Sequence, residues 1–275
     1  MRTGSLTITH AHVWDGAGFD ERDVHIVDGR VADAPAADAR TLDAAGAWVV
    51  PGLIDAHFHA YATSMDGMEN ERGPLSFTAI NGARRLAKAL RRGFTTVRDV
   101  AGGDIGLAQA IDADLFSSPR YHFTGPALSQ TGGHGDPRSA HIDTCFSHGH
   151  MCEVVDGVDA LRLAVRNRLR TGAHAIKIMT SGGVFSLTDP IRNPQYSAEE
   201  VRAVVEEATR RGSYVAAHAY SSEAVIHSIE NGVRSIEHGN LIDAATAARM
   251  ARLGAFLVPT LAAYDAMDRR GAAIA

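Results

Sequence analysis

Two histidines lie two positions apart at the end of an apolar stretch of the sequence. In VVPGLIDAHFHAY, only one residue separates His57 from His59. Because side chains alternate along a β-strand, both imidazoles point to the same side, about 7 Å apart along the strand. Neutral imidazole is the commonest protein ligand for transition metals. The pair therefore predicts a metal-binding site.

Three further apolar segments each carry one residue that can act as a ligand. These residues are Lys177 in AIKIM, His218 in VAAHA and His238 in SIEHG. A single strand-end histidine is more often a hydrogen-bonded core residue, and Lys177 alone could form a salt bridge inside a barrel. Independent accidents do not explain ligand-type residues on four strands. Nitrogen donors favour Zn, Mn or Fe over hard cations, which prefer all-oxygen cages.

The segments that must position these residues alternate between helix and strand. Glycine just past a helix end is a common stop signal, and it precedes five apolar strands, at Gly93, Gly172, Gly212, Gly232 and Gly254. One intervening helix begins with the capping box of Ser197 and Glu200. Strands that alternate with such helices predict parallel pairing in an α/β fold.

This alternation predicts a (β/α)8 barrel of the TIM type over residues 47–275. Seven barrel strands are expected, at residues 48–54, 94–99, 119–124, 173–179, 213–218, 233–238 and 255–259. A closed barrel needs eight strands, and the final segment YDAMDRRGAAIA can begin a helix but cannot supply a strand. Residues 1–46, with short alternating strands and turns, predict a small partial β-sandwich domain.

The motifs PGLIDAHFH, HAY and SIEHG, with the strand lysine, resemble the amidohydrolase superfamily from the N-terminal β element to the end of the chain. The resemblance implies two divalent metal ions, expected to be zinc. His57 and His59 would hold one ion, and His218 and His238 the other. Lys177, carbamylated by carbon dioxide, would bridge them. A lysine buried in a barrel loses its charge readily, and its neutral amine can add carbon dioxide to become an anionic ligand.

Four other segments look most like the prolidase-like, or Xaa dipeptidase, branch: TGGHGD, IKIMTSGGVFS, DPIRNPQYSAEE and HAYS. This resemblance implies hydrolysis of amide C–N bonds in dipeptides or N-acyl amino acids. His134 and Tyr220 would contact the free carboxylate of the substrate. Alternatively, His134 is a loop residue ordered by Asp136. The glycines around it would also suit a mobile cover over the site.

In this superfamily an aspartate at the end of strand eight protonates the leaving amine, a step that amide hydrolysis requires. No residue of this sequence matches it, because Asp265 and Asp268 follow strand seven on an expected helix. The catalytic residue is therefore unassigned, and we expect a chain truncated at its C-terminus or, as a second reading, a short form. A cyclic-amide hydrolase similar to imidazolonepropionase and an inactive metal-binding fragment are alternative functions.

Composition narrows the choice of partners and location. The 275 residues are 45% hydrophobic and carry a net charge of −5, so a basic surface for nucleic acid is not expected. There is no apolar stretch of about 18 residues and no leader segment, which predicts a cytoplasmic protein without membrane contact. Cys145 and Cys152 are expected to be reduced thiols. The expected partner is a small molecule with a free carboxylate, and a homo-oligomer is compatible with the sequence.

Overall fold

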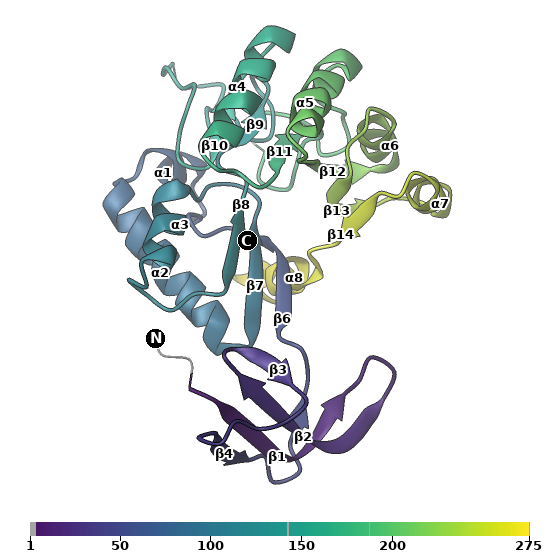
Figure 1. Ribbon diagram of the computed structural model, residues 1–275. Helices are drawn as coiled ribbons and strands as arrows, with labels where there is room; N and C mark the ends of the chain where they lie inside the picture. The colour runs from purple at the N-terminus through teal and green to yellow at the C-terminus, as the bar shows by residue number, and fades with distance from the viewer. Residues whose placement is uncertain (1–3, 142, 187, 275) are drawn as a thin grey trace. The chain divides into compact units, whose positions relative to one another are not determined.

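The computed structural model describes residues 4–141, 143–186 and 188–274. The chain divides into two compact units, Met1–Leu53 and Ile54–Ala275 (Figure 1). The first unit extends past residue 46, the boundary expected from the sequence. The reason is that β5 (Trp48–Val49) pairs in parallel with β1 (Leu6–Trp14).

The first unit is a five-stranded sheet in the order β3-β2-β1-β4, with β5 also beside β1. Its other strands are β2 (Phe19–Val27), β3 (Arg30–Ala32) and β4 (Arg40–Asp43). The turn between β1 and β2 is closed by Asp15, whose carboxylate accepts hydrogen bonds from the N–H groups of Ala17 and Gly18. The strands expected at the N-terminus are therefore present and paired.

The second unit contains two parallel sheets. One has the order β6-β7-β8 and the other the order β10-β9-β11-β12-β13-β14. Their bounds are β6 (Leu53–Phe58), β7 (Phe94–Asp99), β8 (Arg120–Phe123), β9 (Ala127–Ser129), β10 (Cys152–Val154), β11 (Ile176–Met179), β12 (Val215–Ser221), β13 (Ser235–Leu241) and β14 (Phe256–Val258). The expected α/β alternation with parallel strands is confirmed. Across the described ranges, however, no ladder joins β14 to β6 into a closed ring.

Two features of these sheets differ from the sequence-based expectation. The first barrel strand lies at Leu53–Phe58 rather than at 48–54, because Pro51 and Gly52 separate it from β5. The strands β9 and β10 were not expected. Gly125, with φ +70°, and Pro126 interrupt the third strand, so that β8 pairs with β7 while β9 pairs with β11.

The described helices are α1 (Gly67–Arg72), α2 (Leu75–Arg91), α3 (Ile105–Asp112), α4 (Val158–Arg170), α5 (Ala198–Arg210), α6 (Ser222–Glu230), α7 (Ala244–Arg252) and α8 (Leu261–Ile274). Of these, α2, α4, α5, α6 and α7 end just before the predicted stop glycines. The five predicted stop glycines all have positive φ, and the capping box of Ser197 and Glu200 is present at the start of α5. Among these helices, none is both long and apolar enough to cross a bilayer.

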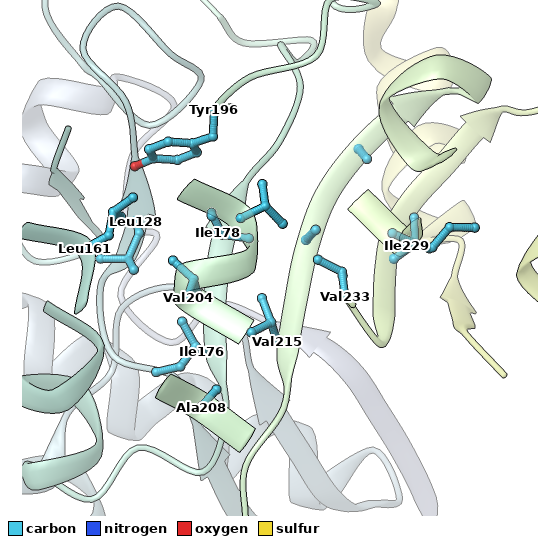
Figure 2. Packing of buried hydrophobic residues seen from close by; sticks show 14 of the residues in the cluster. Leu128, Leu161, Ile176, Ile178, Tyr196, Val204, Ala208, Val215, Ile229 and Val233 are labelled. Carbon is cyan, nitrogen blue, oxygen red and sulfur yellow. The ribbon is translucent and has the colours of Figure 1, made fainter. Parts of the chain in front are cut away.

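The larger core lies between the second sheet and helices α4 to α6. Figure 2 shows Val204 and Ala208 of α5 beside Ile176 of β11 and Val215 of β12. Burying an aliphatic side chain of this size stabilises the fold by about 1.5–3 kcal/mol. This layer therefore fixes β11, β12 and β13, the strands that carry Lys177, His218 and His238. The free thiols of Cys145 and Cys152 are not joined in a disulfide, as expected.

Candidate active site

Four imidazole rings from three strands meet in the second unit. His57 belongs to β6 and His59 follows it, while His218 and His238 belong to β12 and β13. The ring centroids lie 4.8 Å apart for His57 and His59, 4.9 Å for His57 and His238, and 4.6 Å for His218 and His238. The four rings thus form an unbroken chain of contacts.

Lys177 of β11 is buried beside these rings. Its side chain is only 2% exposed, and burial, partly opposed by the carboxylate of Glu237, lowers its pKa to about 8. Burial is also the largest cause that lowers the pKa of each of the four histidines, and the charge of Lys177 contributes in every case. Neutral imidazole is the form that binds metals. The five residues predicted as ligands therefore share one electrostatic environment.

In the first histidine pair, the Nε2 atoms of His57 and His59 face each other. His57 Nδ1 donates to Glu237 Oε2 at 2.8 Å, and His59 Nδ1 donates to the Ala101 carbonyl at 3.2 Å. The remaining Nε2 atoms lie 3.1 Å apart and cannot bond to each other, because both carry lone pairs. Two nitrogens that bind one zinc ion at about 2.0–2.1 Å in tetrahedral geometry are about 3.3 Å apart. The pair therefore fits a shared cation.

The second histidine pair is oriented by its surroundings as well. His218 Nε2 donates to the Gly182 carbonyl at 3.0 Å, which leaves the lone pair of Nδ1 free to bind a metal. His238 Nδ1 lies 2.8 Å from the hydroxyl of Thr260 and 3.2 Å from that of Tyr264, and its Nε2 is free. Metal-binding histidines usually have the second ring nitrogen hydrogen-bonded in this way.

His238 faces the site through an unusual backbone conformation. The parity of β13 directs Ser235 and Glu237 inward and Ile236 outward into the core, so a regular strand would also turn His238 outward. Its φ of +76° and the φ of +59° at Gly239 turn it back. Such a conformation is rare and strained in a residue with a side chain.

Among the described residues, no group of three or more His, Cys, Asp or Glu side chains is arranged to hold a metal ion. The predicted metal ligands do not form such a group of three. Each ion would take two histidines, and the ligand shared between them would come from a lysine.

His134 and Tyr220 lie against this cluster. The ring of His134 stacks on that of His218, and the ring of Tyr220 stacks on that of His238 with centroids 5.1 Å apart. Burial lowers the pKa of His134 to about 4, so its ring is neutral. The Tyr220 hydroxyl is hydrogen-bonded to that of Tyr264.

The glycines on either side of His134 pack closely against neighbouring side chains. A Cβ on Gly133 would meet Gln195 Oε1 at 2.8 Å, and one on Gly135 would meet Ser129 Cβ at 2.9 Å. The N–H groups of His134 and Gly135 also donate to these two neighbouring side chains.

Sequence reasoning missed Arg98 and Glu237. Although burial opposes it, the hydrogen bond from His57 and the charges of Lys177 and Arg98 lower the pKa of Glu237 to about 2. One feature of the sequence could have indicated Glu237. It lies two positions after Ser235, so on a regular strand both side chains point to the same face of the sheet.

Neither acidic residue after β14 reaches the cluster. Asp265 and Asp268 are both exposed on α8, and Asp265 forms an ion pair with Arg269 at 2.9 Å. A cavity of about 620 Å³ lies elsewhere in the second unit, between α1, α3 and α4, and is lined by residues such as Arg72, Asp104 and Arg168. None of the predicted metal ligands lines this cavity. The candidate active site is therefore the histidine and lysine cluster, not the cavity.

Comparison with known proteins gives one family match and several relatives. Residues 48–274 match the amidohydrolase family. Ochratoxinase from Aspergillus niger is 34% identical over 233 residues, covering 77% of this chain and 47% of that protein. The chain therefore spans about half the length of this curated relative.

Solved structures resemble the chain over nearly its whole length. A prolidase crystallised with N-methylphosphonate-L-proline has a TM-score of 0.89 at 43% identity, over 98% of this chain and 69% of that one. A Xaa-Pro dipeptidase with methionine bound in its active site has a TM-score of 0.82 at 29% identity, over 97% and 69%.

Proposed function

We propose that this chain, which belongs to the amidohydrolase family, hydrolyses amide C–N bonds at a two-metal centre formed by its strand ends. The family and the prolidase-like branch indicated by the sequence motifs are confirmed by the comparisons. The metals and the substrate class are our proposal.

The orientation of the imidazoles is the observation that carries this proposal. His57 and His59 turn two lone pairs toward each other at 3.1 Å, an arrangement that a cation between them would stabilise. His218 and His238 would hold the second ion, and Lys177, as a carbamate, would bridge the two. When bound, such metals polarise a carbonyl and lower the pKa of water towards neutrality.

We propose that the substrate is a dipeptide or an N-acyl amino acid. His134 and Tyr220 lie directly against two of the proposed ligands, and both carry groups able to hydrogen-bond a carboxylate. A free carboxylate in their reach would bring the neighbouring amide to the metal centre. The group that protonates the leaving amine is not assigned to a described residue.

Metal analysis and a substrate panel test the proposal. Zinc content should be two ions per chain. His57→Asn or His59→Asn should lose the first ion, and His218→Asn or His238→Asn should lose the second. His227→Asn, a helical histidine bonded to the Tyr196 carbonyl, is the matched control. Unchanged metal content when both pairs are replaced would refute the assignment.

The panel should contain Xaa-Pro dipeptides, N-acyl amino acids and cyclic amides. Turnover restricted to substrates with a free carboxylate is the expected result. Turnover of cyclic amides alone would instead favour the imidazolonepropionase-like alternative. Metal binding without any turnover would favour the inactive metal-binding protein.

A further inference from the structure

A buried carboxylate lies behind His57. Glu237 is completely buried, and its two oxygens have different partners. Oε2 accepts from His57 Nδ1 at 2.8 Å, while Oε1 accepts from Arg98 Nη2 at 2.6 Å and from Ser235 Oγ at 2.7 Å. The carboxylate therefore cannot rotate without breaking a charge-assisted bond.

Arg98 contacts both Glu237 and the backbone beside His57. It belongs to β7, yet its Nε donates to the Ala56 carbonyl of β6 at 2.7 Å, next to His57 in the chain. Its Nη1 also donates to Ser235 Oγ of β13 at 3.1 Å. A single guanidinium thus ties the backbone beside His57 to the carboxylate that contacts the His57 ring.

We propose that Glu237 is a positioning residue that fixes the tautomer of His57, and that Arg98 holds Glu237 in place. An ionised carboxylate only accepts hydrogen bonds, so the proton of a neutral His57 must lie on Nδ1. The Nε2 lone pair is then directed toward His59. The inference deepens the proposed metal centre and rests on it only for its effect on metal affinity.

His57 differs in this respect from the other proposed ligands. His59 and His218 are held by backbone carbonyls, and His238 by two hydroxyls. Of these four, His57 is held by a charged side chain, which a single substitution can change without moving the backbone. Its tautomer is therefore open to a direct test.

Glu237→Gln is the informative variant. The amide oxygen should take the bond from Arg98, which leaves the NH₂ group to donate to His57 Nδ1. The proton of His57 should then move to Nε2. Nitrogen-15 NMR of the metal-free protein reports this change, and zinc affinity measured against a competing chelator should fall about 10-fold to 100-fold, as is typical when such partners are lost.

One control separates this effect from a general loss of structure. Glu153→Gln makes the same charge change at an ion pair with Arg168, away from the proposed ligands. This variant should keep His57 protonated on Nδ1 and keep the wild-type zinc affinity.

The proposal is overturned if His57 of the wild-type protein carries its proton on Nε2, a measurement that does not depend on whether Glu237→Gln folds. It is also overturned if Glu237→Gln keeps the Nδ1 proton and the zinc affinity. If the tautomer switches as expected but the wild-type protein binds no zinc, the positioning role stands and the proposed metal centre fails.

Discussion

The ring of His134 lies flat on the ring of His218, with centroids 3.9 Å apart and planes inclined by 16°. A residue proposed to contact the substrate carboxylate is thereby placed directly beside a proposed metal ligand. The carboxylate and the scissile amide of a substrate that uses both must be close together. Under the proposed function, this spacing would suit a substrate with a single residue between the scissile amide and the free carboxylate.

Tyr220→Phe should weaken the binding of substrates that have a free carboxylate. A hydrogen bond to a charged group contributes roughly 1.5–3 kcal/mol, so KM should rise about 10-fold to 100-fold. Steady-state kinetics on a dipeptide and on its C-terminal amide measure the effect, with the amide as the control. An equal loss on both substrates would argue against contact with the carboxylate.

Lys177 can be tested cleanly, because the sequence contains only two lysines, Lys88 and Lys177. With ¹³C-bicarbonate, NMR should show one carbamate signal that persists in Lys88→Ala and disappears in Lys177→Ala. The Lys177→Ala variant should also lose bound metal, and short carboxylates should partly restore it. Full occupancy of both metal sites with a free Lys177 ammonium would contradict the bridging role.

Gly183→Ala should disturb the site without changing any polar group. A Cβ at this position would lie 2.3 Å from His134 Cε1 and 2.9 Å from His218 Nε2, so at least one ring must move. Because ligand geometry tolerates only about 0.5 Å of error, zinc affinity should fall about 10-fold or more. Gly18→Ala, where a Cβ meets nothing within 4 Å, is the control, and equal affinities in the two variants would count against this account.

Glu207 should make stability depend on pH. Hydrogen bonds from Arg166 and Arg162 lower its pKa to about 2 from an ordinary value of 4.5. A lowered pKa in the folded state stabilises the fold above the unfolded pKa, and this contribution is lost as pH falls towards 2. Urea unfolding should therefore show that Glu207→Gln is less stable than wild type at pH 7, by an amount that shrinks between about pH 4.5 and 2.

Glu206→Gln is the control for this experiment, because Glu206 is half-exposed and pairs with Arg162. Its deficit should be smaller at every pH, and added salt should reduce both deficits. A Glu207→Gln deficit that does not change between pH 7 and pH 2.5 would show that the ion pairs are not its cause.

The sequence predicted that His57 and His59 point to the same side, because strand alternation depends only on neighbouring residues. The same rule fails at His238, where a left-handed residue reverses the side chain, and only Gly239 hinted at it. The pairing of Arg98 with Glu237 joins residues far apart in the chain. It becomes visible only when strand order and register are known.

Sequence periodicity does not reveal which strands pair. The change of partner at Gly125 and Pro126, where β8 pairs with β7 and β9 pairs with β11, is therefore visible only in the structure. Around His134, glycine has two physical meanings, mobility and close approach. The close approach becomes visible only from the positions of Gln195 and Ser129.

The left-handed backbone at His238 links stability and function at one residue. Holding a side chain at φ +76° costs of order 1–3 kcal/mol, a cost that glycine at this position would largely avoid. Selection for thermal stability alone should therefore replace this histidine readily. Directed evolution of a more heat-resistant variant will need a simultaneous screen for metal binding, since otherwise the strain and the ligand are removed together.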